Sequence, residues 1–255
     1  MGRPARRPAT RQQSTAGAQN DAALESGFGE KGYLDEIWHR ESSTPTHLAT
    51  ACTGRHNPLM NANIPALGAE VPRRGNWITD GLSALAFRLS GWRFAGTFPN
   101  VPKMVVIVAP HTSNWDFFIG LMAMFGMGMR GTFLGKHTLF RWPIGIVMRW
   151  LGGVPVIRSS SHNVVDQTVA YFRTRERMVL ALSPEGTRKK LPAWKTGFYY
   201  VAKGAGVPIV PVSFDFPQRL ITVYAPVMPT DDKDADFRLL ESHFEARMAK
   251  HPSQY

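Results

Sequence analysis

Short apolar, β-branched runs alternate with segments of helical periodicity along residues 76–255 of this chain. The clearest run, residues 105–109, ends at Pro110, and a helical apolar run at 117–122 follows after a short loop. Further strands are predicted at 131–136, 154–158, 178–182, 207–212 and 220–224, and further helices at 163–173, 194–205 and 234–250. This order predicts an α/β fold whose mixed, largely parallel sheet has helices on both faces.

Residues 1–75 differ in composition from the rest and are predicted to be a mostly disordered N-terminal extension. Residues 42–74 are scattered with Pro, Thr, Asn and Gly and show no sustained period, so they offer too little apolar surface to offset chain entropy. A short helix is expected at 33–40. The first twenty residues are basic and acid-free, which leaves a transit peptide open as the functional alternative. A true start at Met60 is a further alternative.

The charge balance favours an anionic partner. The formal net charge is +11, and residues 1–74 carry nine Lys and Arg against seven Asp and Glu, so most of the excess lies in the predicted domain, 76–255. Phosphate, nucleic acid and acidic lipid are all compatible with such a surface. No nucleic-acid-binding motif accompanies the dispersed basic residues, so we expect no nucleic-acid partner. The single cysteine, Cys52, excludes an intramolecular disulfide and a multi-cysteine metal site.

Two Trp- and Arg-bearing stretches are candidates for a membrane surface. The apolar residues of 77–94 have helical spacing, and a stretch at 139–151 mixes Trp, Arg and aliphatic residues. Such a helix can lie in a membrane interface, or it can pack on the core of a soluble domain. The longest uncharged apolar run, 117–129, is short of the roughly 20 residues that span a bilayer. We therefore expect no transmembrane helix and no secretory signal.

A histidine and an aspartate stand five positions apart at the predicted strand-to-helix turn, in the run His111-Thr-Ser-Asn-Trp-Asp116. At this spacing Asp116 can cap the helix and also present a carboxylate oxygen to the imidazole of His111. That pairing is typical of a general base whose tautomer is set by a carboxylate. A helix cap beside a surface histidine would show the same spacing, so the pair alone leaves both interpretations open.

A second group of polar residues, Glu185-Gly186-Thr187-Arg188, follows the predicted strand 178–182, at the end where open α/β sheets bind ligands. Gly186 allows close approach of a ligand, Glu185 can accept hydrogen bonds, and Arg188 offers a planar donor fork. Arg158, at another strand end, and Lys195 can complete a phosphate pocket. A tight turn with a surface ion pair is the alternative interpretation.

Four blocks in order resemble the glycerolipid acyltransferase family, which includes bacterial 1-acylglycerol-3-phosphate acyltransferases. They are residues 111–116, 153–158, 184–188 and 207–212, within a resemblance that covers roughly 102–226. The resemblance implies that His111 is the general base and that Asp116 orients it. It also implies that Arg158, Glu185, Gly186 and Arg188 form the acceptor's glycerol-phosphate site and that the fourth block lines the acyl side. With Thr187 and Lys195 added, these four residues make up the predicted substrate-binding set. Two positions depart from the family pattern, Ile157 and Ser183, where an acidic residue and Phe are usual.

The resemblance also implies a reaction: transfer of a fatty acyl group from acyl-CoA or acyl carrier protein to the hydroxyl of a lysophospholipid such as 1-acylglycerol-3-phosphate. The expected protein is a peripheral (monotopic) enzyme of phospholipid biosynthesis at the cytoplasmic face of a membrane. It needs no cofactor or metal, because the thioester is a co-substrate. A basic membrane-surface or nucleic-acid-binding protein without catalysis remains the alternative.

Overall fold

The computed structural model describes residues 64–75, 77–156 and 161–255. Its centre is a seven-stranded sheet in the order β1-β7-β6-β2-β5-β3-β4, in which all neighbours are parallel except the antiparallel pair β6–β7. The strands are β1 (Arg93–Ala95), β2 (Lys103–Ala109), β3 (Gly131–Lys136), β4 (Gly153–Val156), β5 (Met178–Leu182), β6 (Ile209–Asp215) and β7 (Leu220–Val223). The mixed, largely parallel sheet is the one that the sequence predicts.

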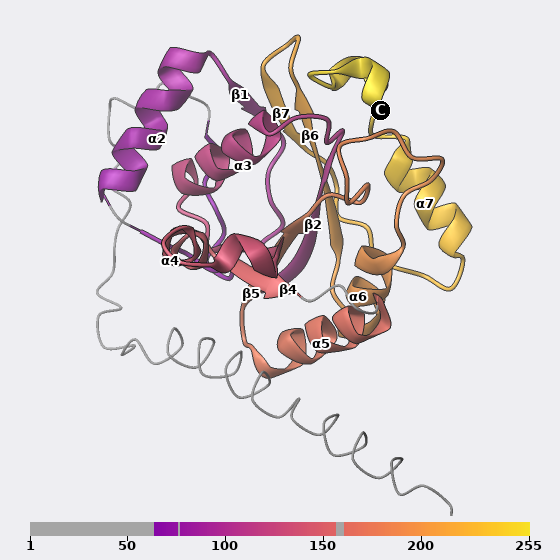
Figure 1. Cartoon of the computed structure of the whole chain (residues 1–255). Helices are drawn as coiled ribbons and strands as arrows, with labels where there is room; N and C mark the ends of the chain where they lie inside the picture. The colour runs from indigo at the N-terminus through magenta and orange to yellow at the C-terminus, as the bar shows by residue number, and fades with distance from the viewer. Residues whose placement is uncertain (1–63, 76, 157–160) are drawn as a thin grey trace, which may run out of the picture. The chain divides into compact units, whose positions relative to one another are not determined.

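The helices cover both faces of this sheet. They are α2 (Trp77–Ser90), α3 (Trp115–Gly126), α4 (Ile144–Trp150), α5 (Ser161–Thr174), α6 (Gly197–Ala205) and α7 (Lys233–Glu241), with 3-10 turns η2 (His137–Phe140), η3 (Ala246–Met248) and η4 (Pro252–Gln254). Figure 1 shows α2, α3 and α4 on one side of the sheet and α5, α6 and α7 on the other. Within the described residues, no helix is long and apolar enough to cross a bilayer.

The strand order explains why the helices divide between the two faces. The connection β2–α3–β3 crosses β5 in one direction along the sheet, whereas β5–α6–β6 crosses β2 in the other. Because parallel crossovers are right-handed, helices leaving in opposite directions lie on opposite faces. The chain therefore diverges outside the carboxyl ends of β2 and β5, and such a divergence opens a crevice in which α/β proteins bind ligands.

The central strand β2 is the apolar run that organises the fold. Its residues Met104, Val105 and Ile107 are fully buried because β5 pairs on one side and β6 on the other. A parallel strand enclosed in this way loses contact with water on both faces, which accounts for its continuous, not alternating, hydrophobicity. The rigid centre of the sheet thus ends at the loop that carries His111.

At the amino-terminal end of the domain, two predicted boundaries differ in the structure. The helix expected over 77–94 ends at Ser90, because Gly91 adopts a left-handed φ of 72° and donates its N–H to Phe87. Arg93–Ala95 then pairs with β7 as the edge strand β1. The predicted extension reaches residue 75, yet residues 64–75 pack on the domain, with Leu67 and Val71 buried in the main core. The rest of the predicted extension, including its short helix at 33–40, lies outside the described residues.

The final predicted helix is also shorter than expected. It was predicted over 234–250, but α7 stops at Glu241 and only the 3-10 turn η3 follows. Asp232 caps its start by accepting the N–H of Ala235 at 2.9 Å. Beyond Ser242 the chain turns back, so that Phe216 donates its N–H to Met248. Tertiary contact with the β6–β7 turn therefore overrides the local helical pattern there.

Candidate active site

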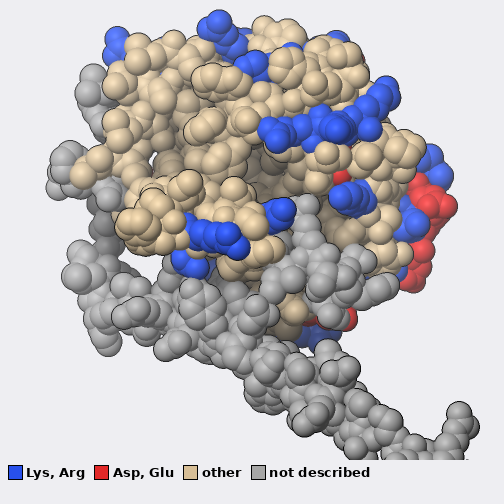
Figure 2. Space-filling view, in the orientation of Figure 1, with Lys and Arg blue, Asp and Glu red and all other residues tan. Residues whose placement is uncertain are grey.

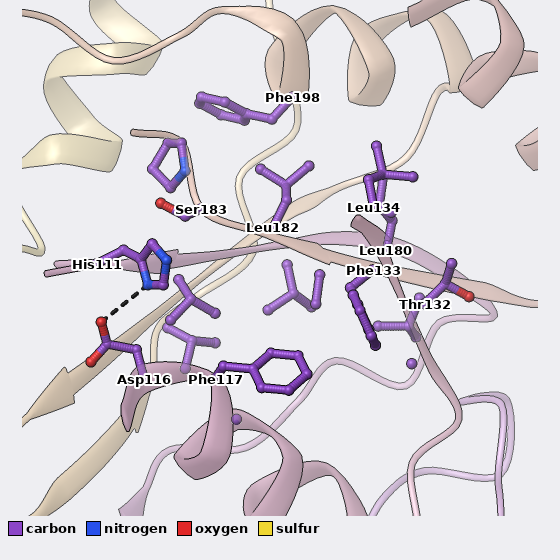
Figure 3. Close-up of a pocket in the computed structure, with 18 of the residues that line it drawn as sticks. His111, Asp116, Phe117, Thr132, Phe133, Leu134, Leu180, Leu182, Ser183 and Phe198 are labelled. Atoms are coloured by element: carbon purple, nitrogen blue, oxygen red, sulfur yellow. Dashed lines mark ion pairs between the residues drawn. The ribbon is translucent and has the colours of Figure 1, made fainter. Parts of the chain in front are cut away.

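The loop between β2 and α3 places His111 against Asp116. The distance from His111 Nδ1 to Asp116 Oδ2 is 3.0 Å, and the carboxylate side chain is 1% exposed (Figure 3). The same oxygen accepts the N–H of Ser113 at 2.8 Å, and Ser113 Oγ accepts the N–H of Trp115 at 3.2 Å. These bonds fold the loop around the carboxylate, which also lies in the first turn of α3, where a negative charge is favoured.

The orientation of the pair determines what the imidazole can do. When Nδ1–H donates to the carboxylate, Nε2 is the unprotonated nitrogen of the neutral ring. His111 lines a cavity, so Nε2 is available to a proton donor bound there. This arrangement has the requirements of a general base: a partner that sets the tautomer and a space for the reacting hydroxyl.

The cavity beside His111 has a volume of about 950 Å³ and extends from the carboxyl ends of the strands into the apolar interior. The β3–β5 ladder stops at the pair Phe133–Ala181, although both strands continue beyond it. The residues past this point, among them Leu134 and Leu182, line the cavity together with Phe117 and Phe198 (Figure 3). A deep apolar space with a polar mouth suits an elongated apolar ligand that carries its reactive group at one end.

Glu185 is buried behind the histidine and does not line this cavity. Its exposed fraction is 5%, and its Oε1 accepts the backbone N–H of His111 at 2.8 Å. Burial raises the pKa of this carboxyl to about 7. The His111 N–H and the nearby imidazole oppose the rise, and the charge of Asp116 adds to it. In this structure Glu185 fixes the loop that carries His111, and its predicted contact with the acceptor stays a prediction.

The rest of the Glu185 loop does line the cavity, in which Gly186, Thr187, Arg188 and Lys195 share the wall with His111. Gly186 has a left-handed φ of 61°, and a Cβ there would lie 3.1 Å from Lys195 Nζ. The Arg188 guanidinium donates to the side-chain oxygen of Asn114, which ties this loop to the His111 loop. Two strand ends far apart in the sequence are thus joined around one opening.

The chain is similar to known acyltransferases. A family model described as Acyltransferase matches residues 97–215. The 1-acyl-sn-glycerol-3-phosphate acyltransferase of Escherichia coli is 32% identical over 114 residues, which cover 42% of this chain and 45% of that protein. The human 1-acyl-sn-glycerol-3-phosphate acyltransferase beta is 38% identical over 116 residues, 43% of this chain and 40% of that protein. Residues 97–215 are thus similar to the acyltransferase family that the model describes and to glycerolipid acyltransferases among these relatives.

The matched part of the chain spans less than half the length of these two curated relatives. A crystal structure of the 1-acyl-sn-glycerophosphate acyltransferase from Thermotoga maritima matches with a TM-score of 0.48 and 19% identity, covering 65% of this chain and 75% of that chain. The family resemblance seen in the sequence is confirmed by the family match and the curated relatives.

The structure brings together most of the predicted site residues. His111, Asp116, Gly186, Thr187, Arg188 and Lys195 all line the large cavity. Glu185 lies behind it, and Arg158 lies outside the described residues, just past the end of β4. Sequence reasoning missed Lys136, an exposed cation at the carboxyl end of β3 that lines the same cavity. Its position after a predicted strand was the available signal.

Two side-chain oxygens at the cavity, Asp116 Oδ1 and Ser183 Oγ, are buried and make no hydrogen bond within the described part of the chain. Buried polar atoms without partners are uncommon and are found at functional sites. Ser183 stands between β5 and the Glu185 loop, close to His111 in Figure 3. Ser183, one of the two positions that depart from the family pattern, therefore places a hydroxyl in a largely apolar wall.

Proposed function

We propose that this chain transfers a fatty acyl group from a thioester donor, acyl-CoA or acyl carrier protein, to the hydroxyl of a lysophospholipid acceptor such as 1-acylglycerol-3-phosphate. The observation that supports it most is the His111–Asp116 pair at the polar mouth of a large apolar cavity. The family match is consistent with this chemistry, and the named activity of the relatives suggests the acceptor. A noncatalytic surface protein would leave this pair without a role.

The proposed reaction is a direct transfer. Nε2 of His111 removes the proton from the acceptor hydroxyl while its oxygen attacks the thioester carbonyl carbon. The tetrahedral intermediate then breaks its C–S bond, and the imidazolium returns the proton to the departing thiolate. The Asp116 carboxylate stabilises the imidazolium between the two steps, and a base so positioned contributes roughly 10²–10⁴ in rate. The acyl chain occupies the apolar cavity.

The acceptor phosphate requires cations near His111. Arg188 and Lys195 line the mouth of the cavity, and Lys136 approaches it from β3. We include Arg158 as a fourth cation from its place in the sequence. Figure 2 shows basic side chains on both sides of a hollow in this face of the molecule, with acidic side chains gathered toward one edge of the view. Such a charge distribution attracts a phosphorylated head group toward the base.

We further propose that the α2 side of the domain binds a membrane surface. Ile78, Leu82, Leu85 and Leu89 recur on one face of α2 at helical spacing, and each is about half exposed or more. Around α4, Trp142 and Ile146 are also exposed, and Figure 1 places α2 and α4 on the same side of the domain. So many exposed apolar residues on one side of a domain indicate a binding surface. A membrane surface suits them, because a lipid substrate reaches the enzyme from a membrane.

The direct test is a lipid-product assay with acyl-CoA and a panel of lyso-acceptors. Since the base acts only in the transition state, His111→Ala should lower kcat by roughly 10²-fold or more while circular dichroism and thermal melting stay unchanged. His243→Gln serves as the matched control, because that histidine lines neither described cavity. Its ring stacks on Tyr224, with 4.4 Å between the ring centroids. Near wild-type turnover in the His111 variant would remove the proposed role.

A further inference from the structure

A second hollow lies on the other side of the Arg188 loop. Its volume is about 590 Å³, and three stretches of chain form it: residues 112–114, 187–190 and 251–254. It shares Asn114, Thr187 and Arg188 with the large cavity. These shared residues therefore form a wall between two spaces, one of them apolar and deep, the other polar and open.

The charged residues around the second hollow have one sign. Arg188, Lys189 and Lys190 come from one loop, and His251 faces them from the last part of the chain; no Asp or Glu of the described residues lines the hollow. The remaining wall carries hydroxyls and amides, among them Ser253 and Gln254. Clustered ammonium and guanidinium groups beside neutral donors are the chemistry that recognises a phosphate ester.

The third wall is held in place by hydrogen bonds to both loops. His251 donates its N–H to Thr112 Oγ1 at 3.2 Å. With its amide nitrogen toward the loops, Gln254 donates to the backbone carbonyls of Thr112 and Arg188, both at 3.1 Å. Lys250 Nζ also lies 4.6 Å from the centre of the Trp115 ring. The hollow is thus a built feature, in which segment 250–254 bridges the two loops that carry the proposed catalytic and binding residues.

We propose that this hollow is a second anion subsite, which binds a phosphate ester of one of the two substrates outside the acyl cavity. The inference rests on the proposed acyl transfer, because it assumes a substrate whose reactive carbonyl or hydroxyl lies at His111. The wall that the two spaces share allows one ligand to reach both. A phosphate of the thioester donor and the glycerol phosphate of the acceptor have the same recognition chemistry, and the experiment separates them.

The test uses the double variant Lys189→Ala/Lys190→Ala, since both lysines line only the second hollow. The control is Lys233→Ala/Arg238→Ala on α7, which removes the same charge and lines neither cavity. For each protein, KM is measured for acyl-CoA and for the lyso-acceptor, and binding of free CoA, glycerol 3-phosphate and inorganic phosphate is followed by calorimetry.

We expect the lysine variant to raise KM for one substrate by roughly tenfold or more, with the other KM and the control within about twofold. A rise for acyl-CoA and weaker CoA binding identify the donor, and a rise for the acceptor with weaker glycerol 3-phosphate binding identifies the acceptor. Equal effects of variant and control, or none, overturn the inference. If no protein transfers acyl groups, the proposed function fails; lysine-dependent binding of inorganic phosphate would then still support the hollow, and its absence would overturn it.

Discussion

Replacing Glu185 with Gln tests whether this buried carboxyl is a structural support whose ionisation destabilises the folded domain. The side chain is 5% exposed and accepts the backbone N–H of His111 at 2.8 Å. The amide oxygen of Gln can accept the same bond at nearly the same place. The substitution therefore removes the titration and its charge while the contact to the His111 loop is kept.

The magnitude follows from the raised pKa of Glu185, which moves from 4.5 to about 7 because burial disfavours the charged form. Between these values the folded state holds a proton that the unfolded state has released. The free energy of unfolding therefore falls as pH rises through this window, and the full shift corresponds to about 3 kcal/mol. Screening by solvent at the nearby cavity mouth reduces the expected effect to about 1–2 kcal/mol.

The assay is urea unfolding followed by circular dichroism at about pH 5 and about pH 8. Near pH 5 the Glu185→Gln variant and the parent should differ by less than about 0.5 kcal/mol, since both side chains are mostly neutral. Near pH 8 the variant should be more stable by about 1–2 kcal/mol, because only the parent carries a buried charge. Glu176→Gln, at an exposed position, is the matched control and should show no such dependence.

A difference between variant and parent that is the same at both pH values would refute the reasoning, because it would place the effect of Glu185 in packing or hydrogen bonding instead of ionisation. A variant that is less stable near pH 8 would show that the ionised carboxylate strengthens its bond to His111 by more than burial costs. Either result would also change the interpretation of Glu185 as a support that is partly protonated at neutral pH.

Three further perturbations follow from the site. Ser183→Ala should stabilise the domain by about 1 kcal/mol in urea unfolding, because its buried hydroxyl lacks a partner in the described residues. As a control, Tyr199→Phe should destabilise the domain by about 1–2 kcal/mol, because the Tyr199 hydroxyl bonds Asp236 and Thr230. A loss of stability in the Ser183 variant would contradict this prediction. Gly186→Ala should lower the stability by about 1–2 kcal/mol and displace Lys195, since φ is 61° there, and an unchanged melting temperature would argue against a strained turn. Leu89→Ser should weaken binding to anionic liposomes by roughly tenfold in a sedimentation assay, while Leu239→Ser on α7 should not, and equal effects would exclude α2 as the binding face.

The local pattern of the chain was sufficient to predict the sheet and the strand ends that carry the site. The strands at 131–136 and 178–182 lie where the apolar runs place them, and the parallel arrangement follows from their alternation with helices. The pair His111 and Asp116 was also accessible, because it depends on six consecutive positions at one turn. Local spacing determines local geometry, so these features needed no tertiary information.

Tertiary structure alone decided what each polar residue faces. Glu185 was predicted only as part of an acceptor site, and its bond to the backbone of His111, 74 positions away in sequence, arises from the approach of the loop after β5 to the loop after β2. The bridge from Gln254 to Thr112 and Arg188 has no local signal at all. The sequence determined which polar groups lie at the carboxyl ends of the strands. The packing of segments far apart in sequence determined which of these groups face the cavity. Contacts across such sequence distances depend on tertiary packing and not on the local spacing of residues.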